Sequence, residues 1–295
     1  MRHLRPDRSR GFLFLVCIPL ALIYVVSCAP TVLRPAGPAG DYFDATDLFA
    51  KGQVKQCIKF TEGLATSTPP TSYTDRARVL RVVIFSGEVK SFKELAEAYS
   101  KGWAKTKLPS ARSDYGVQRQ NSLEYGGEAA LNLRLVAAQL LKDGELPKGL
   151  TLEAPYPRAE GPTVLAELSR VADGGGIDSA AQDSLATDSL RKGIDDTLGD
   201  IVGGGRAAAR TQLKAGPVKL DNFKFAIYLA RQLEDAAFLF DKKHSFDPKK
   251  FKDVCGEATE MTKAALATLK DNPDKDKEKE VKTLQDEIKA TLKTV

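Results

Sequence analysis

Residues 221–240 read DNFKFAIYLARQLEDAAFLF, and this stretch decides the fold class. Apolar side chains recur in it every three or four residues, which is the spacing that places them on one face of an α-helix. Asp221 stands directly before the pattern, where a helix-capping residue is expected. The stretch is therefore predicted to be an amphipathic helix. Its buried positions would be Phe223, Ile227, Ala230, Leu233, Ala237 and Phe240.

Two further helices are expected between this stretch and the C-terminus. Asp247 and Pro248 begin the first, since proline is favoured at the first helical position, and Asn272 and Pro273 separate it from the second. Short turns make neighbouring helices antiparallel, so the three should form a bundle. The inward positions of the two added helices are Phe251, Val254, Cys255, Ala258, Met261, Ala265 and Leu269, then Val281, Leu284, Ile288 and Leu292.

The N-terminal half shows the same helical periodicity. A helix is expected around residues 54–64, and another is expected to follow the capping box of Ser91 and Glu94. A long helix over residues 128–142 would end at Gly144, after a loop over residues 105–121. The β-branched run at residues 79–85 is predicted to be helix because no strand-like partner lies nearby, although it is the stretch that most favours a strand.

A short repeat links two of these helices. Gly52 and Gly87 lie 35 residues apart, and each opens a Gly-X-Val-Lys sequence before an amphipathic helix. Around the first copy, Ala45, Gly52, Cys57 and Pro69 have a spacing that resembles tetratricopeptide repeats, although Phe92 replaces the small residue in the second copy. The resemblance covers residues 43–104. It implies stacked helical hairpins that expose a face for recognition.

The whole chain is thus expected to be all-α, with helical hairpins followed by a three-helix bundle. Its segments would be a signal peptide (1–27), a tether rich in proline and glycine (28–42), the hairpin region (43–144), a connector (145–177) and a helical bundle (178–295). The connector allows at most a short helix, over residues 163–171. A helix capped by Asp178 would open the last segment and end at the glycines of residues 203–205.

The N-terminus has the features of an export signal. Four arginines precede the apolar residues 11–26, a stretch of 16 residues that Pro19 interrupts, whereas a membrane span needs roughly 20. An uncleaved anchor is the alternative. Val25, Val26, Ser27 and Cys28 resemble the lipobox of bacterial lipoprotein precursors.

The lipobox resemblance implies where the protein resides. Cleavage before Cys28, with lipid on its thiol, would hold the chain on a membrane of the bacterial cell envelope. Ala29 follows the cysteine, and the resemblance then favours the periplasmic face of the outer membrane over the inner membrane.

Charge and cysteine content restrict the function further. Removing residues 1–27 leaves 40 basic and 38 acidic residues, so no strong basic excess points to nucleic acid. Cys57 and Cys255 would be the remaining thiols. A disulfide between Cys57 and Cys255 is one alternative. Both cysteines lie on the apolar faces of expected helices, however, and this favours buried thiols.

No catalytic residue, cofactor or metal is expected. His244 is the one histidine after residue 27, and its charged surroundings indicate a solvated turn. Gly203 and Gly205 imitate a dinucleotide loop, but a helix rather than a strand precedes them. Residues 272–283 imitate a calcium loop, yet Lys277 stands where its glycine should be, so a capped helix start is expected.

We therefore expect a membrane-anchored lipoprotein that binds or scaffolds another envelope protein, with no enzymatic activity. Tyr99 and Trp103 are the candidates to line a groove. Two alternatives are open. One is an envelope hydrolase using carboxylates such as Glu124 and Glu128, which a convergent acidic pocket would favour. The other is a ligand-binding accessory protein of a transporter, which a closed apolar cavity would favour.

Overall fold

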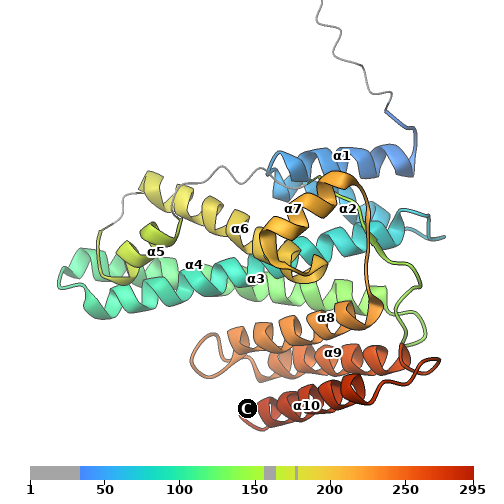
Figure 1. Ribbon diagram of the computed structural model, residues 1–295. Coiled ribbons are helices and arrows are strands. Elements are labelled where there is room, and N and C mark those ends of the chain that lie inside the picture. Colours follow the sequence, from blue (N-terminus) through green and yellow to red (C-terminus); the bar gives the residue numbers. More distant parts are fainter. Residues whose placement is uncertain (1–33, 156–163, 177–178) are drawn as a thin grey trace, which may run out of the picture. The chain divides into compact units, whose positions relative to one another are not determined.

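Two long antiparallel helices, α3 (Thr74–Lys105) and α4 (Pro109–Leu140), pack against each other along their length (Figure 1). The computed structural model describes residues 34–155, 164–176 and 179–295, and Pro35–Val295 form one contact unit. The described residues contain ten α-helices, and the prediction of an all-α fold is confirmed.

The first hairpin consists of α1 (Pro38–Ala50) and α2 (Val54–Ala65). Gly52 turns the chain between them with a φ of 71°, a left-handed conformation that glycine adopts without steric cost. The first copy of the repeat therefore forms the expected hairpin. α1 begins at Pro38, so residues 38–42 are helix and not part of the tether predicted for residues 28–42. Residues 28–33 lie outside the described part.

Helices α5 (Val164–Ala172), α6 (Ser179–Val202) and α7 (Gly205–Ala215) follow. Both α5 and α6 pack on α3, and α7 packs on α6. α5 and α6 match the expected helices, whereas α7 was not predicted, because the glycines at its start signal a helix end. Asp178, the expected cap of α6, lies outside the described residues.

The predicted three-helix bundle is confirmed as α8 (Asn222–Ala237), α9 (Pro248–Ala267) and α10 (Lys275–Leu292). The side chains of Asp221 and Asp247 accept hydrogen bonds from the backbone N–H groups of Lys224 and Lys250, so both expected caps form. A 3₁₀ turn, η1 (Phe238–Phe240), continues α8. The bundle lies against α4 through α8 and α9 (Figure 1).

Two helix boundaries were predicted wrongly. α3 runs unbroken through residues 87–90, so the second repeat copy starts no helix. α4 begins at Pro109 and runs through Gly126 and Gly127, so residues 109–121 are helix and not loop. Added Cβ atoms at these glycines would lie 3.2 Å from Cβ of Phe92 and from Cε1 of Phe240. Close packing explains the two glycines, which alone would favour a break.

A two-stranded antiparallel sheet escaped prediction. β1 (Thr151–Leu152) pairs with β2 (Val218–Lys219), which places the chain after α4 beside the chain before α8. Strands of two residues are too short to show an alternating pattern.

One large apolar cluster joins the hairpin region to the bundle. Its fully buried members include Phe49 of α1, Phe85 of α3, Leu133 of α4 and Phe251 of α9. A smaller cluster holds Tyr99 and Tyr115 with residues of α5 and α6. Among the described helices, none is both long enough and apolar enough to cross a bilayer.

Candidate functional site

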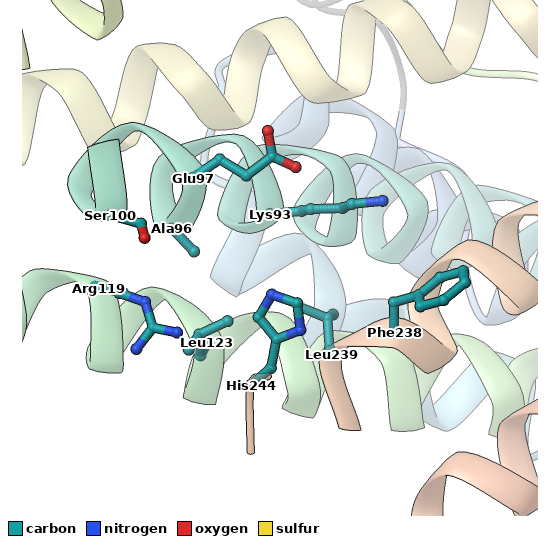
Figure 2. A pocket seen from close by; sticks show the side chains of 9 residues that line it. All are labelled: Lys93, Ala96, Glu97, Ser100, Arg119, Leu123, Phe238, Leu239 and His244. Carbon is teal, nitrogen blue, oxygen red and sulfur yellow. The ribbon is translucent and has the colours of Figure 1, made fainter. Parts of the chain in front are cut away.

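A small cleft lies between α3 and α4, where η1 and the turn after it cover the two helices (Figure 2). Its volume is about 90 Å³. Apolar side chains line one part of it and charged or polar ones the rest. The lining residues are Lys93, Ala96, Glu97, Ser100, Arg119, Leu123, Phe238, Leu239 and His244.

Asp241 organises the turn that covers this cleft. Its Oδ1 accepts hydrogen bonds from the backbone N–H of Lys243 at 2.8 Å and lies 2.7 Å from Nδ1 of His244. Its carbonyl oxygen accepts from the N–H of Phe246 at 3.0 Å. One carboxylate thus fixes both the backbone of the turn and the imidazole of His244.

His244 lies in an exposed turn, as the sequence indicated, and its ring is also oriented by the fold. Its side chain is only 31% exposed, and its ring points from the turn towards α3 (Figure 2). The turn is also tied to α4, because Nη2 of Arg119 donates to the carbonyl oxygen of Lys243 at 3.1 Å. Lys93 forms an ion pair with Asp235. The polar groups around the cleft therefore hold the turn in place.

The size of the cleft decides what it can do. Ligand pockets usually enclose about 300–1,000 Å³, so a cleft of about 90 Å³ suits a few water molecules rather than a metabolite. A histidine oriented by an aspartate is an arrangement that general bases use. Ser100 lines the same cleft, but within the described residues no hydrogen bond joins it to His244. The arrangement supports a structural role for His244.

A second group of charges surrounds Glu88 on α3. Burial, and after it the neighbouring carboxylate of Glu128 on α4, raise the pKa of the Glu88 carboxyl to about 7. Lys55 of α2 and Arg81 oppose both effects. Glu88 is therefore the carboxyl in this group whose charge changes near neutral pH.

The carboxylates singled out from the sequence lie apart from the small cleft. Glu124 and Glu128 are both exposed on α4, and Glu124 accepts a hydrogen bond from Gln120 at 2.9 Å. Neither lines the small cleft or either of two larger ones. One of these lies beside Tyr42 and Glu153, and the other lies between α9 and α10.

The two aromatic residues expected to line a groove differ in how deeply they are buried. Tyr99 is buried, with its ring centroid 6.0 Å from that of Tyr115. Trp103 is 47% exposed, and the guanidinium of Arg112 lies over its ring at 5.2 Å. Neither lines any of the three clefts, so a groove formed by this pair stays a prediction.

The remaining sequence candidates have structural places. Cys57 and Cys255 are free, buried thiols. Gly203 and Gly204 form the turn between α6 and α7, and Gly205 begins α7. Asp274 caps α10 by accepting from the N–H groups of Asp276 and Lys277. Cys28 lies outside the described residues.

Comparison with known proteins gives no relative for this arrangement: no protein-family model, curated protein or solved structure matches the chain.

Proposed function

We propose that the protein is a lipid-anchored lipoprotein of the bacterial cell envelope, on the periplasmic face of the outer membrane, and that its helical unit binds or scaffolds another envelope protein. The lipobox at residues 25–28 supports the anchor. The observation that carries the binding role is a group of exposed apolar side chains at one end of the α3–α4 pair.

We call this group the hairpin tip and define it as Trp103, Leu108 and Leu165. Leu108 joins α3 to α4 and is 65% exposed, and Leu165 on α5 is 62% exposed. α5 is held at this end of α3, because a Cβ added to Gly102 would clash with the carbonyl oxygen of Val171. Exposed apolar surface that is contiguous is typical of a site that another molecule covers, and we propose that these three side chains contribute to such a surface.

The backbone beneath the hairpin tip is fixed before any partner binds. Arg112 stacks on Trp103 and also donates from Nη2 to the carbonyl oxygen of Thr106 at 3.1 Å. The hydroxyl of Tyr115 donates to the carbonyl oxygen of Gly175, which ties α4 to the chain after α5. A preformed surface loses little conformational entropy on binding, and this favours recognition of a folded partner.

The exposed positions of Glu124 and Glu128 also favour a binding role over hydrolysis. General acid–base catalysis at neutral pH needs a carboxyl held near the substrate, usually with a pKa raised by burial. The two glutamates lie on the solvent side of α4, away from the three clefts. A binding surface at the hairpin tip requires neither of them.

The anchor is tested by metabolic labelling with a palmitate analogue. We expect label on the protein and cleavage before residue 28, and the Cys28→Ser variant should accumulate as an unlabelled precursor. A mature protein without lipid, or with another N-terminus, would contradict the anchor.

The binding role is tested with a lipid-free chain that starts at residue 29, used to capture proteins from detergent-solubilised envelopes. The double variant Leu108→Ser, Leu165→Ser should lose a specific partner, whereas Leu135→Ser, Leu266→Ser should keep it. Leu108 is the N-cap of α4, where serine is favoured, so its replacement leaves the helix intact. Loss of the partner in the control pair alone would place the binding surface elsewhere.

A further inference from the structure

The turn that covers the small cleft belongs to a strongly basic segment. We define the basic loop as residues 241–252, which hold five lysines against two aspartates. All five lysines are exposed. The chain after residue 27 is close to electrically balanced, so this is a local concentration of positive charge.

The two aspartates of the basic loop are engaged in holding its backbone. The carboxylate of Asp241 accepts from the backbone N–H of Lys243 and contacts the imidazole of His244. The carboxylate of Asp247 caps α9 and forms an ion pair with Nζ of Lys250 at 3.2 Å. In the part of the chain that the structure describes, the other four lysines form no ion pair. These four are Lys242, Lys243, Lys249 and Lys252.

An exposed aromatic residue lies between these lysines in the sequence. Phe246 is 54% exposed and has a φ of 39°, in the left-handed region that large side chains rarely adopt. Phe240 and Phe251 on either side are buried in the core. The chain thus buries the phenylalanines before and after Phe246 and holds Phe246 outside at a cost in backbone strain.

The loop holds Phe246 in this conformation through several bonds. The N–H of Phe246 donates to the carbonyl oxygen of Asp241 at 3.0 Å. The N–H of Asp247 donates to the carbonyl oxygen of Phe240, also at 3.0 Å. The hydroxyl of Ser245 donates to the carbonyl oxygen of Leu239 at 2.7 Å. The ring is therefore presented on a fixed turn.

We propose that the basic loop docks on the surface of an anionic lipid bilayer, with Phe246 inserted among the headgroups and the unpaired lysines against lipid phosphates. An exposed aromatic ring with lysines before and after it in the chain suits such an interface, because the ring prefers the boundary region and the cations are attracted to the negative potential of the bilayer. Preference for a bilayer over an acidic protein rests in part on the proposed anchor at Cys28, which would keep the loop near a membrane.

Residues 28–37 are long enough to span the separation along α3 between the entry of the chain and the basic loop. The described chain enters the unit beside Tyr73, next to the start of α3, whereas the loop covers α3 residues 93–100. About 20 residues of α-helix separate these places, or about 30 Å. The ten residues from Cys28 to Gly37 can extend over at most about 35 Å.

The test uses the lipid-free chain from residue 29, so that its outcome is independent of acylation at Cys28. We expect it to cosediment with phosphatidylcholine vesicles that contain phosphatidylglycerol and not with vesicles of pure phosphatidylcholine, and to be released by high salt. The variant Lys242→Glu, Lys249→Glu should bind at least about tenfold more weakly. The control Lys275→Glu, Lys279→Glu makes the same charge change at exposed lysines of α10 and should bind normally.

Insertion is read out separately with Phe246→Trp in a Trp103→Phe background. Its fluorescence should shift to shorter wavelength with the anionic vesicles only. Absence of binding to anionic vesicles, equal binding to both kinds, or equal loss in the control variant would overturn the proposal. Binding to soluble polyglutamate but not to vesicles would also overturn the proposal, because it would indicate that the basic loop binds an acidic protein instead of a bilayer. Lipid labelling at Cys28 would stand in any of these cases.

Discussion

Gly87 of α3 and Gly193 of α6 face each other where the two helices cross, with no room for a methyl group on either. A Cβ added at Gly87 would lie 2.7 Å from Cγ1 of Ile194 and 2.8 Å from its backbone nitrogen. A Cβ at Gly193 would lie even closer to the carbonyl oxygen of Gly87. The contact sets how closely α6 packs on α3.

Gly193→Ala should therefore destabilise the fold. The added methyl group meets backbone atoms, which cannot rotate away, so we expect a loss of about 3 kcal/mol or more in the free energy of unfolding. Urea denaturation followed by circular dichroism measures it. Gly63→Ala on α2 is the control, because its Cβ would meet nothing within 4 Å, and alanine should stabilise that helix by about 0.5–1 kcal/mol. Equal stability of the two variants would contradict the close crossing.

Stability should fall as pH rises through neutrality, because of Glu88. Burial and Glu128 raise the pKa of Glu88 from 4.5 to about 7, so between these values the folded chain holds a proton that the unfolded chain has lost. The contribution is fully present below about pH 4.5 and is lost as pH rises through about 7, with a total on the order of 3 kcal/mol.

Glu88→Gln tests this expectation, since glutamine resembles the protonated carboxyl at every pH. Denaturation midpoints at about pH 5 and about pH 8 should differ less in the variant than in the natural protein, and the variant should be the more stable of the two at the higher pH. Glu124→Gln, at an exposed carboxyl of α4, is the control and should leave the pH dependence unchanged. An unaltered pH dependence in Glu88→Gln would show that another group titrates.

The thiols of Cys57 and Cys255 should resist alkylation while the protein is folded. Burial raises the pKa of each thiol to about 12, so the reactive thiolate is scarce at neutral pH, and the sulfur atoms are also inaccessible. Maleimide labelling of the lipid-free chain that starts at residue 29, read by mass spectrometry, should find no adduct in native buffer and two in denaturant without reductant. If label appeared only after reduction, a disulfide would join the two cysteines.

Sequence patterns predicted the parts of the fold that local chemistry controls. Asp221 and Asp247 cap their helices, and Gly52 makes the turn of the first hairpin, because each position needs a property of that residue type. Gly87 misled the prediction. In sequence it resembles the turn glycine of a repeat, whereas in the fold it permits a close helix crossing that only tertiary structure reveals.

The candidate surfaces were harder to predict for a related reason. Residues 241–252 can be recognised as a charged turn, but nothing local distinguishes exposed Phe246 from the buried Phe240 and Phe251. Leu108 was expected in a loop, and its exposure depends on α4 beginning at Pro109. Periodicity identifies buried faces well, whereas a residue exposed at the end of a helix has no periodic signature.

The central claim, that the anchored protein binds an envelope partner through its hairpin tip, is tested most directly by photocrosslinking in cells that produce the native protein. A photoreactive amino acid at position 108 should give a discrete crosslink to one envelope protein, and the same amino acid at position 135, which is 49% exposed elsewhere on α4, should give none. The lipid-free chain should compete with the crosslink, and its Leu108→Ser, Leu165→Ser variant should not. Two results would contradict the account. One is a crosslink from position 135 and none from position 108. The other is a crosslink from position 108 that the Leu108→Ser, Leu165→Ser variant suppresses as strongly as the unaltered lipid-free chain does.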